Sequence, residues 1–312
     1  MSGAATPASA LVACDLDRTL IYSPRAFWLD TADADAPRLA VSELYQGVPI
    51  SFMTRSAEEL LLELRGRSVF VPVTTRTVIQ YQRVQLPGPV PRFAVTSNGG
   101  VLLVEGVPDA DWAAAVRRRL GEEAAPIAQV TALLEAPLAA AWITKVNNAE
   151  NLFVYAIVDR AAMPAAWVDE LTATCGALGW SVSVQGRKLY CVPHSVTKSD
   201  AVREVRRRAG TSTVLAAGDS LLDQGMLEEA DRAFRPAHGE LDEAGFASAN
   251  LTITASRGIL AGEELLRLLA AAVDRAGSAS GSGAGSASDV ALSGAASGGP
   301  ALRVTPGASR TR

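Results

Sequence analysis

The sequence predicts an α/β fold with a doubly wound parallel sheet and an inserted α+β domain. Short uninterrupted apolar runs alternate with stretches of helical periodicity, as in LVACDLD at 11–17 followed by SAEELLLELRG at 56–66. Uninterrupted apolar runs are typical of strands buried on both faces, and helices between such strands are typical of a parallel sheet. Between residues 101 and 187 the pattern changes to strand-like pieces joined by polar turns, which predicts a second, smaller module.

The remaining core elements follow in the order expected of such a sheet. SVFVPVTT at 68–75 is typical of a buried strand, DAVREVRRRAG at 200–210 of an amphipathic helix, and TVLAAGD at 213–219 of another buried strand. We therefore expect a discontinuous core made of residues 10–100 and 188–275.

The inserted segment 101–187 contains its own helices and strands. A helix is predicted at 109–120 and a second at 165–179, and the stretch AWITKVNNAENLFVYAIVD at 141–159 predicts two strands around a polar turn. WSVSVQ at 180–185 predicts a further strand. This composition indicates a cap-like α+β domain within the core sequence.

Both ends of the chain lack the composition of a folded domain. Residues 1–9 are small and polar, and residues 276–312 are rich in Gly, Ser and Ala with almost no large apolar side chain. Such segments cannot offset the entropy cost of ordering, so we expect a disordered N-terminus and a flexible tail. The tail could be a solubilising extension or an interaction segment.

Charge and cysteine content narrow the classes of function. The net charge is −4, and the three arginines near the C-terminus leave the rest of the chain still more acidic, which argues against a nucleic-acid partner. No apolar run approaches the ~18 residues of a membrane span. The three cysteines are widely spaced without a CxxC pair, which indicates neither a disulfide framework nor a zinc site and favours a cytoplasmic location.

Two aspartates follow the first apolar run. In CDLDRT, Asp15 and Asp17 lie at the carboxyl end of a predicted parallel strand, where doubly wound sheets bind ligands. Neighbouring carboxylates repel each other when both are ionised, and a cation or a proton relieves that repulsion. This pair is therefore a candidate for metal binding or acid–base catalysis; the alternative is an ordinary pair of surface acids.

Three further stretches carry groups suited to phosphate and metal chemistry. Thr74 and Thr75 end the second strand, where hydroxyl and backbone N–H groups can hold phosphate oxygens. Lys198, one of three lysines against 26 arginines, begins an amphipathic helix and carries a compact charge that fits where arginine would crowd. In GDSLLD, Asp219 and Asp223 can share one face of a starting helix and offer Mg²⁺ oxygen ligands, although Asp223 could instead be a helix-starting acid.

Together these motifs (DxDxT, a threonine after a strand, a lone lysine and GDxxxD) resemble those of the haloacid dehalogenase-like (HAD) superfamily of phosphohydrolases. FAVTSNGGVLL at 93–103, KSDAVREV at 198–205 and TITASRGILAGEELL at 252–266 are similar to the branch with a large α/β cap, which includes Cof-like and sucrose-phosphatase-like members. The resemblance covers about residues 11–272 and follows the cap only in outline.

The resemblance implies a role for each motif residue. Asp15 matches the nucleophile that forms an aspartyl-phosphate, and Asp17 matches the acid–base that protonates the leaving alcohol. Thr74, with Thr75, and Lys198 match the phosphate holders. The Mg²⁺ ligands are matched by four residues: Asp15, Asp17 through its backbone carbonyl, Asp219 and Asp223. The expected activity is that of a phosphatase acting on a small phosphorylated metabolite, with a sugar phosphate favoured.

Some features depart from the family pattern or lie outside its motifs. The branch commonly has TGR where this chain has Thr74, Thr75 and Arg76, and the segment 22–52 is longer than the branch needs. It could form a flap over the site or a surface excursion. Substrate choice is expected to reside in the cap. Candidate substrate residues are Asn98, Lys145, Arg187 and Lys188.

Two other functions fit the same motifs. A phosphosugar mutase of the phosphomannomutase-like type would retain the phosphate on its product, and a low-turnover module would bind phosphate or a partner without hydrolysis.

Overall fold

The computed structural model describes residues 10–136, 139 and 141–282, and the expected N-terminal segment 1–9 and the tail from 283 onward lie outside them. Its central sheet has five parallel strands in the order β14-β13-β12-β1-β4, as predicted for a doubly wound fold. The strands span Ala10–Cys14 (β1), Val69–Pro72 (β4), Thr213–Ala217 (β12), Arg232–Arg235 (β13) and Leu251–Ile253 (β14).

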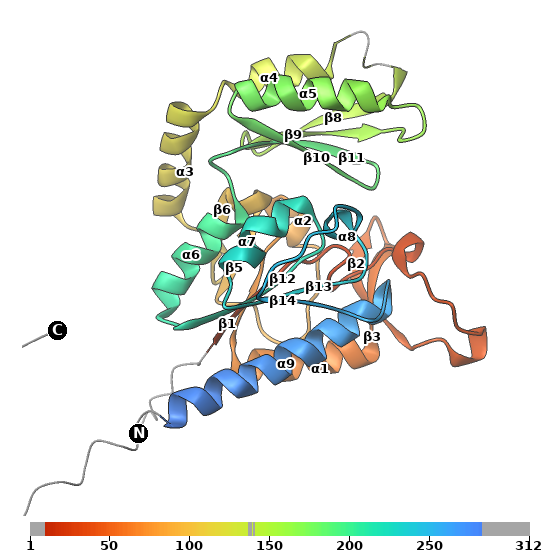
Figure 1. Ribbon diagram of the computed structural model, residues 1–312, viewed down its shortest axis with the longest axis vertical. Coiled ribbons are helices and arrows are strands. Elements are labelled where there is room, and N and C mark those ends of the chain that lie inside the picture. The colour runs from red at the N-terminus through yellow and green to blue at the C-terminus, as the bar shows by residue number, and fades with distance from the viewer. Residues whose placement is uncertain (1–9, 137–138, 140, 283–312) are drawn as a thin grey trace, which may run out of the picture.

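Helices cover both faces of this sheet (Figure 1). Val12 and Cys14 of β1 pack with Leu61 of α1 (Arg55–Arg67) and Leu265 of α9 (Ile259–Ser282). The alternate residues Leu11 and Ala13 face the other way and share a core with residues of two other helices. Those helices are α6 (Lys198–Ala209) and α7 (Gln224–Glu229). Because side chains alternate along a strand, one short apolar run supplies both cores.

Helix α9 extends beyond the expected start of the tail. It continues to Ser282, whereas we expected flexible chain from residue 276. Alanine is the strongest helix former, so the stretch that follows Leu269 continues the helix started on the sheet. Among the described residues, no helix is both long and apolar enough to cross a membrane.

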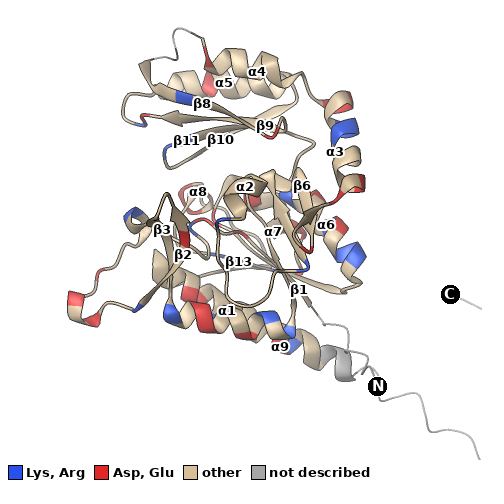
Figure 2. Ribbon diagram, turned by 180° about the vertical axis from the view of Figure 1, so that it is seen from behind, with Lys and Arg blue, Asp and Glu red and all other residues tan. Residues whose placement is uncertain are grey.

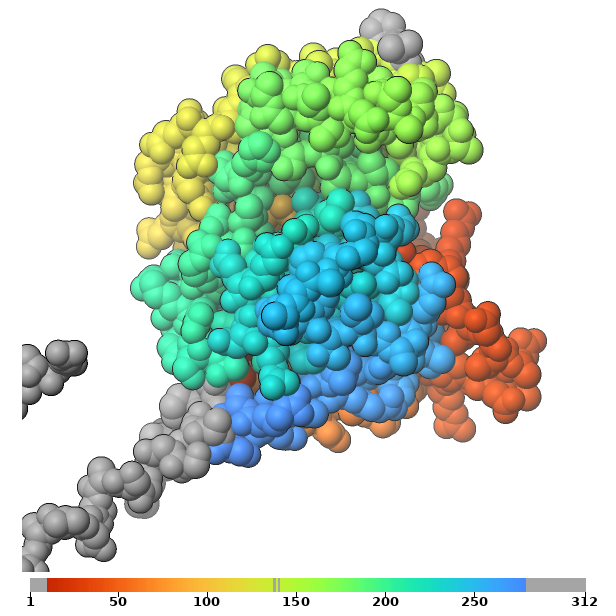
Figure 3. Space-filling view, viewed as in Figure 1, coloured from red at the N-terminus to blue at the C-terminus, as the bar shows by residue number. Residues whose placement is uncertain are grey.

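A hairpin and a small sheet flank the central sheet. The segment 22–52 contains short 3₁₀ turns, η1 (Pro24–Ala26) and η2 (Asp33–Asp35), and most of the hairpin of β2 (Leu39–Tyr45) and β3 (Val48–Thr54), which packs on α1 and α9. It projects beside the core (Figure 3). The small sheet contains β5 (Phe93–Thr96), β6 (Val101–Val104) and β7 (Val107–Pro108), and a parallel bridge between Val73 and Val95 joins it to the core.

The second module is an antiparallel sheet of order β10-β11-β9-β8 beneath two helices. Its strands are β8 (Ile143–Ala149), β9 (Phe153–Val158), β10 (Trp180–Gln185) and β11 (Lys188–Pro193). Helices α4 (Ile127–Leu134) and α5 (Ala165–Ala177) lie on the side away from the core, and α3 (Ala110–Glu123) leads into the module (Figure 1). Below, this module is called the cap.

The cap boundaries shift by a few residues from those expected. β11 is a cap strand, although residues from 188 onward were expected in the core, because it pairs with both β9 and β10. β6 at 101–104 pairs with β5 and belongs to the core side. We therefore place the cap at 110–193.

Figure 2 shows charged residues on the helices α1, α3 and α6, whereas the strand β1 carries none.

Candidate active site

The adjacency of β1 and β12 brings two of the predicted motifs together. Cys14 lies opposite Ala217 in the parallel ladder, and the backbone N–H of Asp15 donates to the Ala217 carbonyl at 2.9 Å. Asp15 and Asp219 therefore emerge at the same edge of the sheet, next to each other. This is the position at which doubly wound sheets bind ligands.

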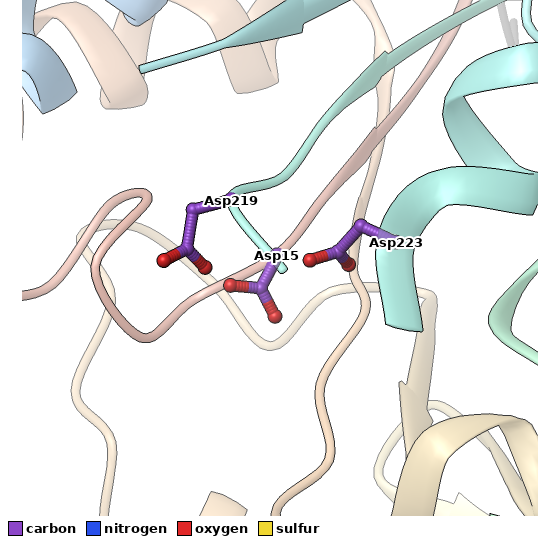
Figure 4. A group of neighbouring side chains, drawn as sticks. All are labelled: Asp15, Asp219 and Asp223. Atoms are coloured by element: carbon purple, nitrogen blue, oxygen red, sulfur yellow. The ribbon is translucent and has the colours of Figure 1, made fainter. Parts of the chain in front are cut away.

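Three carboxylates meet at this edge. Each of Asp15, Asp219 and Asp223 offers one carboxylate oxygen, and these oxygens all lie within 4.8 Å of one another. Figure 4 shows the Asp15 carboxylate between those of Asp219 and Asp223. All three residues are buried, with Asp223 fully so. We call this group the carboxylate cluster.

The glycine of GDSLLD lets Asp223 enter the cluster. A Cβ on Gly218 would lie 2.4 Å from the Asp223 Cγ, so only glycine leaves room for this carboxylate. The backbone N–H and the hydroxyl of Ser220 donate to Asp223 Oδ2 at 3.0 and 2.7 Å. Asp223 therefore completes a capping box with Ser220 at the start of η5 (Leu221–Asp223), the helix-starting role named as the alternative, and is buried in the cluster at the same time.

Lys198 inserts its ammonium group into the carboxylate cluster. Its Nζ donates to Asp15 Oδ1 and to Asp223 Oδ1, both at 2.6 Å, and the residue is 1% exposed. Burial alone would lower the pKa of Lys198, but the two carboxylates raise it above its ordinary value. The Thr197 hydroxyl accepts from the N–H of Asp200 and caps α6, which fixes the start of the helix that carries this lysine.

The cluster retains excess negative charge. Burial raises the pKa of Asp15 to about 7, although Lys198 acts to lower it, and burial together with the Asp15 charge raises the pKa of Asp219 well above its ordinary value. Among the described residues, Arg18 is the only basic side chain within ion-pair distance of the Asp219 carboxylate, with Nε 3.7 Å from Oδ2. Buried oxygens short of positive partners fit a divalent cation such as Mg²⁺.

Asp17 pairs with Arg76 and is not one of the three carboxylates of the cluster. Its two oxygens accept from Nε and Nη2 of Arg76 at 2.7 and 2.8 Å, in a bidentate pair. Burial acts to raise the pKa of Asp17, but the Arg76 guanidinium outweighs it and lowers the pKa below the ordinary value. The Asp17 side chain is 47% exposed, so it lies at the mouth of the site.

The partner of Arg76 was missed by the sequence analysis. Nη1 of Arg76 lies 2.8 Å from Glu43 Oε2, and Nε of Arg83 donates to Glu43 Oε1 at 3.0 Å. Glu43 is 1% exposed and belongs to β2, where the hairpin register shifts on both sides of it. A bulge of this kind redirects a side chain, and no sequence motif predicts such a bulge. The segment 22–52 thus supplies a buried carboxylate to the site.

The threonine motif forms the neighbouring loop. Thr74 is fully buried, and its hydroxyl accepts from the N–H of Arg76 at 3.1 Å. Thr75 is partly exposed beside it. The Asn98 side chain is buried, donates from Nδ2 to the Val196 carbonyl at 2.9 Å, and therefore joins the β5–β6 turn to the segment by which the chain returns from the cap. Its role in substrate binding stays a prediction.

One of the candidate substrate residues of the cap faces the core. Lys188 Nζ lies 5.6 Å from the Tyr155 ring centroid and 6.0 Å from that of Tyr190, on the cap sheet. The pKa of Lys188 is raised, mainly by Tyr190 and against the effect of burial, with Asp17 contributing. By contrast, Lys145 is exposed on β8, and Arg187 is exposed in the turn between β10 and β11.

The carboxylates of two glutamates bridge the cap and the core. Glu150, in the β8–β9 turn, accepts from the Val78 N–H at 3.1 Å and from the Ser97 hydroxyl. Glu240, at the start of α8 (Glu240–Glu243), accepts from the hydroxyl of Ser183 at 3.0 Å and from the N–H of Leu221 at 3.2 Å. The structure therefore has the cap in contact with the core on both sides of the site.

The chain is similar to known proteins in structure, whereas sequence comparison finds no match. No protein-family model matches the chain, and no curated protein gives a significant sequence match. The sucrose-phosphatase of Synechocystis sp. PCC6803, solved with sucrose and phosphate, is similar in structure, with a TM-score of 0.57 and 17% identity over 86% of this chain and 99% of that one.

Two further solved structures show the same arrangement. The C-terminal domain of C. albicans trehalose-6-phosphate phosphatase has a TM-score of 0.54 and 13% identity, over 85% of this chain and 92% of that one. The HAD subclass IIB sugar phosphatase BT4131 has a TM-score of 0.50 and 13% identity, over 86% and 98%. The chain has the fold of the haloacid dehalogenase-like phosphatases with a large α/β cap, as its motifs predicted.

Proposed function

We propose that this protein is a Mg²⁺-dependent phosphatase that hydrolyses a small phosphorylated metabolite, preferably a sugar phosphate, through an aspartyl-phosphate. The observation that carries the proposal is the carboxylate cluster with Lys198 inserted into it. A buried carboxylate held by an ammonium group, beside two others, is suited to attack an anionic phosphorus centre once the charges are balanced.

In the first step an oxygen of Asp15 attacks phosphorus and the ester P–O bond breaks. Lys198 favours the ionised form of the buried Asp15 carboxylate, because its charge acts to lower the pKa that burial raises, and it balances the charge of the incoming phosphate. Asp17 gives its proton to the departing alcohol oxygen. Because Arg76 holds the pKa of Asp17 low, this role requires Asp17 to leave Arg76 and take up a proton when the ester enters.

In the second step water attacks the phosphorus of the aspartyl-phosphate. Asp17 accepts the proton of that water, and inorganic phosphate leaves with Asp15 regenerated as a carboxylate. An ionised Asp17, as its pairing with Arg76 favours, suits this step. Thr74, with Thr75, would hold a phosphate oxygen at the end of β4.

The cation would be held by Asp15, Asp219 and Asp223, with the backbone carbonyl of Asp17. When bound, Mg²⁺ would screen the repulsion between the phosphate and the carboxylates and position both. A sugar phosphate is favoured as substrate because the neighbours named above are sugar phosphatases, and because Lys188, which lies over the Tyr155 and Tyr190 rings of the cap sheet, is close enough to Asp17 for their charges to interact.

The test is phosphate release by the purified protein from a panel of phosphorylated metabolites, with Mg²⁺ and with a chelator. We expect release with Mg²⁺ only, and its loss in Asp15→Asn. The matched control is Asp169→Asn, which removes an exposed carboxylate on α5. Unchanged release by Asp15→Asn would refute the mechanism. Isomerised sugar without free phosphate would indicate a mutase instead.

A further inference from the structure

A cavity of about 710 Å³ lies beside the carboxylate cluster, where the cap meets the segment 22–52. Its walls come from three parts of the chain: residues 18–28, Pro49 with Ile50 in β3, and the turn at 186–187. Arg18 lies within the DxDxT motif, directly before its threonine, Arg25 lies in η1, and Gly186 and Arg187 form the turn of the β10–β11 hairpin in the cap. In Figure 3 the red segment lies at the right of the molecule, and its upper part reaches the green cap.

Three arginines line this cavity. Arg18 links it to the carboxylate cluster, because its Nε lies 3.7 Å from Asp219 Oδ2. Among the described residues, neither Arg25 nor Arg187 has a carboxylate within ion-pair distance. The guanidinium groups of Arg25, from the core side, and Arg187, from the cap, therefore line one cavity without a carboxylate partner among the described residues and suit a carboxylate or phosphate oxygen pair.

The aromatic wall of the cavity is Trp28. Its backbone φ is 43°, in the left-handed region that a tryptophan rarely adopts, and it is 44% exposed. The His238 ring lies 5.0 Å from its ring, and the Cζ atoms of Arg18 and Arg257 lie 5.2 and 6.0 Å away. A strained residue of this kind persists only where its surroundings hold it, and such residues cluster at functional sites.

The loop that carries Trp28 is held in place by contacts with Gly258 and His238. A Cβ on Gly258 would lie 2.0 Å from the Phe27 carbonyl oxygen, and the N–H of Ile259 donates to that same oxygen at 3.1 Å. His238 Nδ1 accepts from the N–H of Gly258 at 3.2 Å, and its Nε2 lies 2.8 Å from the Arg18 carbonyl oxygen. The indole is therefore held in place beside the arginines before any ligand arrives.

We propose that this cavity is a subsite for a second anionic group of the substrate. The proposal rests on the proposed phosphatase function and narrows its substrate to a phosphomonoester that carries another carboxylate or phosphate. With its ester phosphate at Asp15, such a substrate would extend past Arg18 along the face of Trp28. Arg25 from the core and Arg187 from the cap would bind the second anion, so binding would also join cap to core.

The test compares substrates with and without a second anion. The pairs are glucose 6-phosphate with 6-phosphogluconate, and fructose 6-phosphate with fructose 1,6-bisphosphate, which separate a carboxylate from a phosphate. We expect kcat/KM to be about tenfold or more higher for the doubly anionic member of at least one pair, as charge-assisted hydrogen bonds allow. The ratio of kcat/KM for the doubly anionic substrate to that for its singly charged partner should fall at least about fivefold in Arg25→Gln. In the double variant Arg25→Gln/Arg187→Gln the same ratio should fall toward one.

Arg117→Gln is the matched control, because it removes an exposed arginine of α3 far from the cavity and should keep the wild-type ratio. Equal kcat/KM within both pairs would overturn the subsite while leaving the phosphatase function standing. A preference for the doubly anionic substrate that remains in Arg25→Gln/Arg187→Gln would also overturn the subsite.

A binding measurement separates the subsite from turnover. Titration of the protein with 6-phosphogluconate, fructose 1,6-bisphosphate and their singly charged partners should change tryptophan emission with the doubly anionic ligand. The change should disappear in Trp28→Phe and weaken in Arg25→Gln. No difference between ligands would overturn the subsite. If the protein released no phosphate from any ester, the phosphatase function would fail, and this titration would still decide the subsite.

Discussion

Lys198 shows how one side chain sets the electrostatics of the site. Its ammonium group is buried between Asp15 and Asp223, where it is 2.6 Å from an oxygen of each. Removal of one partner from a buried ion pair leaves uncompensated charge, which usually costs more than the pair contributes. The lysine is thus needed for the fold of the site as well as for the proposed chemistry.

Lys198→Met should therefore lower the free energy of unfolding by about 3 to 5 kcal/mol in chelator. Because three carboxylates would then face each other, Mg²⁺ should raise the melting temperature of this variant more than that of the wild type. Thermal and urea unfolding with and without Mg²⁺ measure both effects. Lys145→Met, at an exposed cap position, should change stability by less than about 0.5 kcal/mol. Equal stabilisation of all three proteins by Mg²⁺ would contradict the assignment of the cluster.

The acid–base role of Asp17 can be tested through the leaving group. A p-nitrophenolate ion departs without a proton, whereas a sugar alkoxide needs one. Asp17→Asn should lower kcat for glucose 6-phosphate by about 10² to 10⁴, and reduce formation of p-nitrophenol from p-nitrophenyl phosphate much less in the first turnover. Stopped-flow kinetics separate that turnover from later ones. The same loss for both esters would mean that Asp17 acts only by holding Arg76.

Several site residues were predictable because their positions follow from strand ends. Asp15 and Asp219 end adjacent parallel strands, so a sheet of the predicted type brings them together whatever their separation in sequence. The direction of the Asp17 side chain could not be predicted in this way. It depends on Arg76, whose own position depends on Glu43 from a hairpin that no motif marks.

The β2–β3 hairpin contributes to the site through its bulge. Between Val41 and Leu44 the register shifts, and both Ser42 and Glu43 are buried. Glu43 then contacts Arg76 and Arg83 and accepts from the Ser51 hydroxyl at 3.0 Å. The hairpin is thereby attached to the loop that follows β4.

Glu43→Gln should lower the free energy of unfolding by about 2 to 4 kcal/mol, because two guanidinium groups lose their buried carboxylate. Urea unfolding followed by far-UV circular dichroism measures the change. Glu59→Gln, an exposed acid on the adjacent helix α1, is the comparison and should remain within about 0.5 kcal/mol of wild type. If both variants unfolded at the same urea concentration as wild type, the Glu43 pairs would contribute nothing to stability.

Regular elements were predictable where periodicity was strong, as in β1, β12 and α6. The hairpin was not, because its strands carry exposed apolar residues such as Val41 and Val48 together with buried polar ones, which obscures the alternation of a half-buried strand. The end of α9 was placed too early, since a Gly- and Ser-rich composition hides the alanines that extend it.

His238 stabilises the molecule by joining loops that follow three different strands. The ring contacts the Arg18 carbonyl, the Gly258 N–H and the rings of Tyr22 and Trp28, and the residue is 2% exposed. Burial lowers the pKa of His238 to about 4. The folded protein therefore keeps this ring neutral at pH values where the unfolded chain protonates it.

Because the unfolded chain alone binds this proton between about pH 6.5 and pH 4, stability should fall as the pH is lowered through that range. The contribution of His238 is a loss of about 2 kcal/mol at pH 5 relative to pH 7.5. Urea unfolding at both pH values should show a smaller loss for His238→Asn than for wild type. Exposed His194→Asn should retain the wild-type dependence. Identical pH dependence for wild type and His238→Asn would refute this contribution.

The arrangement of cap and core was predictable only in outline. The change of pattern after residue 100 indicated an inserted module, but the contacts that hold it, such as Glu240 with Ser183 and Leu221, join residues with no shared motif. Such contacts depend on the final packing of two separately folded sheets. The cavity beside Trp28 arises in the same way, from three segments that meet only in the folded protein.

The central claim is that Asp15 is the residue phosphorylated during turnover. Borohydride reduces an acyl phosphate, so it should convert a phosphorylated aspartate to homoserine, which peptide mass spectrometry locates. The Asp17→Asn protein is suited to this trap, because its second step should be slow while p-nitrophenyl phosphate still reacts. We expect homoserine at position 15 only when both the ester and Mg²⁺ are present. Release of phosphate with position 15 unmodified, or reduction at another carboxylate, would contradict the mechanism.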